Sequence, residues 1–187
     1  MSAGTRSIYR GAWRIDVTIR PRVNLPVAVA ALSRAIAAAL DAAGAPAPAS
    51  VGLILADDRA LAALNEEHMG ERGPTDVLSF PMLPPAAFPR HAGQTAEARR
   101  RDRARSFVLP PGRRVHVGDM VVSVERALAQ AQAGRGGQTG DIGWSVAEEL
   151  RLLVVHGTLH LCGWDHRLPA EEAAMRQLER RILGGLR

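Results

Sequence analysis

The segment 145–166, near the end of the chain, constrains the fold more than any other feature of the sequence. It opens with Ser145 and Glu148, which stand in the pattern of a capping box that begins a helix. Four side chains then repeat on one side at helical spacing, namely Leu150, Leu153, Val154 and Thr158. We therefore predict a helix over residues 145–161, with a turn after it.

Three histidines lie at the end of this predicted helix. His156 and His160 are four residues apart, so both imidazoles can point to one place on the same face. Gly163 allows the backbone to leave the helix in a left-handed conformation, and the chain can then return His166 as a third ligand. Three neutral nitrogen ligands suit zinc and leave a position open for water or substrate. The alternative is three unrelated histidines, which this spacing disfavours.

The residue after the first histidine narrows the chemistry. The spacing HxxxHxxGxxH is that of the metzincin proteases, which place a glutamate there to take a proton from the zinc-bound water. This chain has Gly157 instead. Hydrolysis of a peptide has thus lost its proton carrier, whereas a phosphodiester needs a metal and arginines to neutralise developing charge. The sequence favours phosphodiester chemistry over proteolysis.

The rest of the chain is predicted to alternate strands and helices. Strands are predicted over 13–19, 51–55, 77–80 and 115–124, and helices over 26–43, 58–68, 125–133 and from 169 to 182. Asp57 should cap the second helix, and Pro81 favours an edge position for the third strand. The segment 84–113 has no sustained periodicity, so we predict a long, flexible, arginine-rich loop without regular elements.

Composition sets the class of protein. A chain of 187 residues with 47% hydrophobic side chains fits one domain, 1–187. It has neither a long apolar run nor a secretory signal, so we expect a cytoplasmic protein. The single cysteine, Cys162, cannot form an intramolecular disulfide, and we expect it in the core. The net charge is +5, and all the positively charged side chains counted in it are arginines, several of which crowd residues 90–114. They could bind phosphate or form a solvated loop.

Two motifs resemble one known family. HGTLHLCGWDH, from His156 to His166, and PTDVLSFP, from Pro74 to Pro81, are similar to the two signatures of the YbeY endoribonucleases, the rRNA maturation factors. The resemblance continues through LADD at 55–58, GDMV at 118–121 and EEL at 148–150, and so spans roughly residues 10–183.

The resemblance implies a fold and an activity. It implies an α+β domain, with a small mixed sheet packed with helices and a metzincin-like site at the end of a central helix. It also implies one zinc ion on His156, His160 and His166, and metal-dependent cleavage of single-stranded RNA. The roles implied are 16S rRNA 3′-end maturation and ribosome quality control, with ribosomal RNA and the small ribosomal subunit or its associated proteins as partners.

The chain departs from the family pattern at one important position. Met69 stands where the family has a functional arginine, so either Arg72 or an arginine of the 90–114 segment reaches the phosphate instead, or the activity is weakened. Asp165 could orient a ligand imidazole or accept a proton, although an aspartate in a turn more often bonds the local backbone. Asp76 and Ser79 could line the cleft, or could be a turn residue and a polar strand residue.

Two other functions stay open at this point. One is a non-catalytic RNA-binding factor for ribosome assembly, in which the metal only stabilises the fold. The other, less favoured because of Gly157, is a metalloprotease-like hydrolase.

Overall fold

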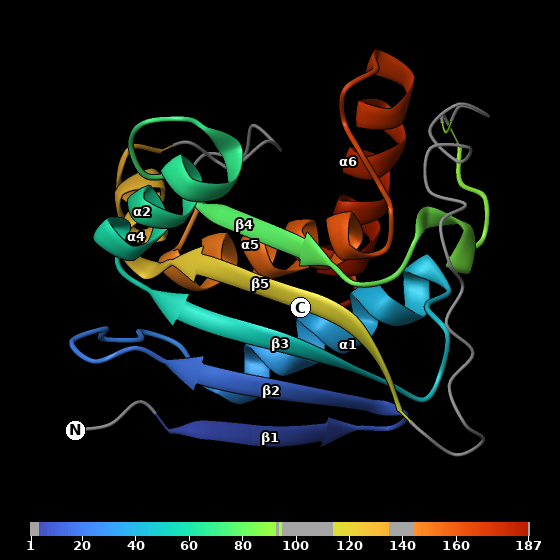
Figure 1. The fold of residues 1–187 in the computed structure, drawn as a ribbon, viewed down its shortest axis with the longest axis horizontal. Coiled ribbons are helices and arrows are strands. Elements are labelled where there is room, and N and C mark those ends of the chain that lie inside the picture. The colour runs from blue at the N-terminus through green and yellow to red at the C-terminus, as the bar shows by residue number, and fades with distance from the viewer. Residues whose placement is uncertain (1–3, 93, 95–113, 135–143, 187) are drawn as a thin grey trace.

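A twisted mixed sheet forms the frame of the molecule (Figure 1). The structure, a computed structural model, describes residues 4–92, 94, 114–134 and 144–186. Within these residues the sheet has five strands in the order β1-β2-β3-β5-β4. The strands are β1 Thr5–Arg10, β2 Trp13–Ile19, β3 Ala49–Ala56, β4 Val77–Pro81 and β5 Val115–Ser123. The central strands β2, β3 and β5 are parallel, and the two edge strands β1 and β4 are antiparallel to their neighbours.

The helices cover one face of this sheet and one end of it (Figure 1). They are α1 Val29–Ala43, α2 Asp58–Met69, α4 Val124–Gln132, α5 Val146–Leu161 and α6 Pro169–Gly184, with a short 3-10 helix, η1, at Pro85–Ala87. Helices α1, α5 and α6 pack together behind the sheet, and α2 and α4 lie at the end where β3 and β5 finish. The predicted α+β architecture with a small mixed sheet is confirmed.

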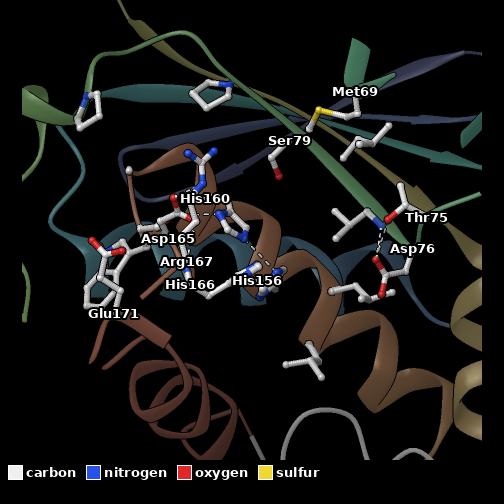
Figure 2. A pocket seen from close by; sticks show the side chains of 18 of the residues that line it. Met69, Thr75, Asp76, Ser79, His156, His160, Asp165, His166, Arg167 and Glu171 are labelled. Carbon is white, nitrogen blue, oxygen red and sulfur yellow. Dashed lines mark hydrogen bonds and ion pairs between the residues drawn. The ribbon is translucent and has the colours of Figure 1, made fainter. Parts of the chain in front are cut away.

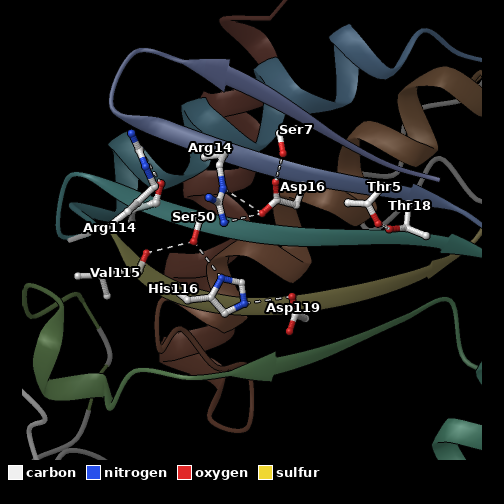
Figure 3. Close-up of polar contacts among 11 residues, drawn as sticks. Thr5, Ser7, Arg14, Asp16, Thr18, Ser50, Arg114, Val115, His116 and Asp119 are labelled. Atoms are coloured by element: carbon white, nitrogen blue, oxygen red, sulfur yellow. Dashed lines mark hydrogen bonds and ion pairs between the residues drawn. The ribbon is translucent and has the colours of Figure 1, made fainter. Parts of the chain in front are cut away.

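The core lies between the sheet and α1, α5 and α6. Inward residues of the strands, such as Ile15 and Leu53, are fully buried there, as are Ile36 of α1 and Leu159 of α5. In β2 the alternate side chains point to the other face, which is polar (Figure 3). This alternation is the pattern expected of a sheet with only one apolar layer beneath it.

Local signals in the sequence explain most of the element boundaries. Asp57 accepts a hydrogen bond from the N–H of Ala60 and caps α2, which ends at Gly70 in the left-handed conformation. The predicted edge position of β4 is confirmed. Helix α1 begins at Val29 rather than at residue 26, because Ala28 is still extended and offers no side-chain cap.

Two elements correct the predictions from sequence. Strand β1 was not predicted, because its side chains are mostly exposed and its order comes from antiparallel pairing with β2 across a tight turn at Gly11. The segment 84–113 was predicted to lack regular elements, yet it contains η1. Residues 93 and 95–113 of that segment lie outside the described residues. None of the helices described could cross a membrane.

Candidate metal centre

The end of α5 brings the three histidines together. The helix begins with the predicted capping box, in which Ser145 Oγ accepts from the N–H of Glu148 at 3.2 Å. It ends because Gly163 takes a positive φ of 81°. The N–H of Trp164 then donates back to the carbonyl of Leu159 at 3.0 Å, which closes the helix end. The chain turns there and carries His166 back towards α5 (Figure 2).

A contact with the segment before β5 secures this turn. A Cβ on Gly163 would lie 3.2 Å from Cα of Pro85, so η1 packs directly on the glycine. The ring of His91 stacks on Trp164 with centroids 4.0 Å apart, and its Nε2 lies 3.2 Å from the Gly163 carbonyl. The position of the third histidine therefore depends on residues more than 70 positions earlier in the chain.

The three imidazoles converge on one point. One nitrogen of each of His156, His160 and His166 lies within 4.8 Å of the other two. The Nε2 atoms of His156 and His160 are 3.1 Å apart. The three side chains thus form a group that could hold a metal ion, as Figure 2 shows.

The partners of the other ring nitrogens decide what these Nε2 atoms can do. His156 Nδ1 donates to Oε1 of Glu179 at 2.7 Å, and His160 Nδ1 donates to the carbonyl of Trp164 at 2.9 Å. In a neutral ring whose Nδ1 donates, the lone pair is on Nε2. The Nε2 atoms of the two rings, 3.1 Å apart, are therefore the nitrogens that a metal ion would bind. The donor set therefore fits a metal ion.

Burial keeps one of these rings neutral. Desolvation by burial, together with the positive charges that His156 and His166 would carry, lowers the pKa of His160 to about 4. A ligand imidazole must be neutral, so at pH 7 His160 is ready to bind a cation. Burial also raises the pKa of the Cys162 thiol to about 12, and Cys162 is buried in the core as predicted.

Glu179 is a functional residue that the sequence analysis missed. It lies on α6, its carboxylate is almost fully buried, and it holds His156 from 23 residues away. A carboxylate behind a ligand imidazole fixes the ring and raises its basicity. The available signal was an acid on the apolar side of α6, beside Met175, Leu178 and Ile182.

Packing explains why a glycine follows His156. A Cβ on Gly157 would lie 3.1 Å from Cγ2 of Val77 and 3.2 Å from Oγ of Ser79, because β4 crosses the helix there. The Ser79 hydroxyl donates to the Gly157 carbonyl at 3.1 Å. The position of the protease glutamate is thus taken by β4.

A cleft of about 1500 Å³ opens beside the histidines, between β4 and one side of α5. Asp76 and Ser79 line it, as the sequence suggested, together with Asp165 and the exposed side chain of Met69. Asp76 also has a turn role, because it accepts from the N–H of Val77 at 2.8 Å.

Asp165 is engaged with its neighbours in the turn. Its Oδ1 accepts from the N–H of His166 at 2.8 Å, and its Oδ2 pairs with Nε of Arg167 at 3.0 Å. This is the local bonding that an aspartate in a turn usually makes. A catalytic role for Asp165 stays a prediction.

Of the arginines predicted to bind phosphate, those that the structure describes do not line the cleft. Arg72 is exposed and is not among the cleft residues. Arg90 does not line the cleft either, and Arg114 donates to the carbonyls of Ala12 and Ala49 at the opposite end of the sheet. The arginines of residues 95–113 lie outside the described residues. Among the described residues, the arginine that lines the cleft is Arg167.

The family model and the similar sequences agree on one family. The model of a family described as Endoribonuclease YbeY matches residues 21–187. A protein of Roseiflexus sp. (strain RS-1) named Endoribonuclease YbeY is 37% identical over 173 residues, which are 92% of this chain and 92% of that protein. A protein of the same name from Symbiobacterium thermophilum is 37% identical over 73% of this chain and 71% of its own. A solution structure of a Thermotoga maritima protein covers 91% of this chain and 90% of its own, with 17% identity and a TM-score of 0.48.

Proposed function

This chain belongs to the endoribonuclease YbeY family, and from that premise we propose that it hydrolyses single-stranded RNA with a metal ion held by three histidines. The metal is zinc, and its ligands are His156, His160 and His166. The substrate in the cell is ribosomal RNA, at the stage of 16S rRNA 3′-end maturation and ribosome quality control. The small ribosomal subunit or its associated proteins are the partners.

One observation carries the proposal: the Nε2 atoms of His156 and His160 lie 3.1 Å apart, with Nδ1 of each ring engaged elsewhere, beside a large open cleft. A structural zinc site is usually closed by four protein ligands, whereas the described residues offer three here. A cation bound by three side chains keeps a position for a substrate oxygen.

The residues around the centre have separable roles. A bound zinc ion would supply a Lewis acid for a phosphate oxygen. Glu179 fixes the ring of His156, and the Trp164 carbonyl fixes the ring of His160, so both nitrogens stay aimed at one point. Ser79 ties β4 to α5 through the Gly157 carbonyl and thereby sets the wall of the cleft opposite the histidines.

The cleft is suited to a strand recognised through its backbone. Aromatic residues make up 4% of the chain, so platforms for stacking bases are few. The net charge of +5 attracts a polyanion over the whole surface. Cleavage should therefore depend on single-stranded character more than on base identity.

The test is RNA cleavage by purified, zinc-loaded protein on an end-labelled, unstructured oligonucleotide. We expect cleavage by the unaltered protein and none by the double variant His156→Ala with His160→Ala. His116→Ala is the matched control, since it removes a histidine from the opposite face of the sheet. Equal cleavage by the double variant would assign the activity to a contaminant and overturn the proposal.

A second function is favoured by the uncharged Met69 at the mouth of the cleft. In that case the chain is an RNA-binding assembly factor whose metal only stabilises the fold. Removal of zinc would unfold the protein, and the intact protein would bind RNA without cutting it. A metalloprotease-like activity is disfavoured because β4 occupies the space beside Gly157.

A further inference from the structure

Arg167 follows the third histidine and lies at the edge of the cleft. Its side chain is 80% exposed, and it pairs with Asp165 through Nε at 3.0 Å. Figure 2 shows Arg167 and Asp165 beside the histidines, whereas Thr75 and Asp76 lie away from them, at the other side of the view. The arginine is therefore adjacent to the centre rather than at the remote end of the cleft.

The pairing with Asp165 gives the guanidinium a defined orientation. Asp165 is itself held by the N–H of His166, so the arginine is linked to the turn that carries the third ligand. The pair engages Nε, so the two Nη groups keep N–H donors for a further acceptor. These groups form the planar fork that binds phosphate oxygens in a bidentate manner.

The charges around the cleft make this arginine important. The described cleft residues include four acids, Asp76, Glu149, Asp165 and Glu171, and one arginine. Carboxylates repel an RNA backbone, and the pairing with Arg167 offsets the charge of Asp165, which precedes His166. A phosphate could approach the centre favourably only where a positive charge compensates its own.

We propose that Arg167 binds an RNA phosphate next to the metal centre and positions the strand in the cleft. This inference rests on the proposed function, since it requires RNA in the cleft. It assigns to Arg167 the phosphate contact that Met69, which lines the same cleft, cannot make. Asp165 acts through Arg167, as the residue that orients the guanidinium.

The experiment measures the affinity of zinc-loaded protein for a fluorescent, unstructured RNA oligonucleotide over a range of salt concentrations. Arg167→Ala should bind about tenfold more weakly, since one charge-assisted contact is lost. The slope of log affinity against log salt should fall in magnitude by about 0.7, the value for one phosphate on a single strand. Arg167→Lys should keep the slope and recover only part of the affinity, because the fork is missing.

The control is Arg34→Ala, which removes the same charge from an exposed position on α1 outside the cleft. It should change neither the affinity nor the salt slope by a comparable amount. Zinc content is measured for each variant, because Arg167 lies next to a ligand. Arg167→Gln, which can still donate to Asp165, separates loss of the phosphate contact from disturbance of the turn.

The outcomes separate this inference from the proposed function. Equal affinity and salt slope in Arg167→Ala and Arg34→Ala would overturn the role of Arg167, even if the unaltered protein cleaves RNA. Weaker binding with an unchanged slope, or binding that falls only with zinc content, would also overturn it. Failure of the unaltered protein to cleave RNA that it binds would instead reject the proposed function.

Discussion

Two histidine–carboxylate pairs of similar geometry lie on opposite faces of the same sheet. His156 and Glu179 are 2.7 Å apart on the helical face, with side-chain exposures of 11% and 2%. His116 and Asp119 are 3.1 Å apart on the open face, with exposures of 37% and 41% (Figure 3). The pairs differ in burial and, more importantly, in the groups that the second nitrogen of each imidazole ring faces.

The second nitrogen determines which histidine can bind a metal. Nδ1 of His116 lies 3.1 Å from the hydroxyl of Ser50 while Nε2 meets Asp119, so both nitrogens are engaged. His156 uses Nδ1 for Glu179 and keeps Nε2 for the point shared with His160 and His166. A histidine beside a carboxylate is thus no sign of a metal site unless its other nitrogen faces further ligands.

The largest expected effect concerns Cys162, which is buried at the end of α5, on the helical face of the sheet. Because burial raises its pKa to about 12, the thiol should react with iodoacetamide at pH 8 roughly a thousandfold more slowly in the native protein than in the denatured chain. Mass spectrometry of alkylated protein measures this. Rapid native labelling would mean that the end of α5 opens to solvent.

A second prediction compares how the carboxylates of Glu179 and Asp119 affect zinc affinity. Glu179→Gln should lower the affinity for zinc by about 10–100-fold, because His156 loses the charged acceptor that orients it. Asp119→Asn, the same change on the open face, should leave zinc affinity unchanged. Competition with a zinc-binding dye measures both variants. Equal losses in the two variants would contradict the distinction drawn here.

A third prediction concerns the contact between Gly157 of α5 and strand β4. Gly157→Glu should lower the free energy of unfolding by about 1–3 kcal/mol, because its side chain must displace Val77 and Ser79 of β4. Gly184→Glu places the same side chain at the open end of α6 and should change stability by less than about 0.5 kcal/mol. Urea denaturation gives both values, and a stable Gly157→Glu protein would show that β4 yields easily.

The smallest effect is expected on the open face. His116→Ala should reduce the free energy of unfolding by less than about 1 kcal/mol, because its pair with Asp119 is largely solvated. Zinc content should be unaffected. A large loss of stability in thermal unfolding would show that the contact with Ser50 holds β3 and β5 together more strongly than its exposure suggests.

The sequence predicted features that depend on neighbours along the chain. The spacing of His156 and His160, the capping box of α5 and the turn at Gly163 are all local, and each has its expected geometry. Glu179 and β1 could not be predicted in this way. Glu179 reaches the centre only because α6 packs on α5, and β1 is ordered by its pairing with β2.

The arginines of the site also could not be assigned from the sequence alone, because their positions depend on how the chain folds. Arg72 was a reasonable phosphate ligand by its position near Met69, but the end of α2 leaves it outside the cleft. The sequence analysis did not single out Arg167, which follows the third histidine in the turn after α5. Its place in the cleft became visible only with the pairing to Asp165.

X-ray absorption spectroscopy of the zinc-loaded protein tests the central claim most directly. The account predicts a first shell of three imidazole nitrogens and a non-protein oxygen ligand, with no sulfur, since the Cys162 thiol is buried in the core. A sulfur scatterer, a shell of four protein ligands, or failure of the protein to take up zinc would contradict it.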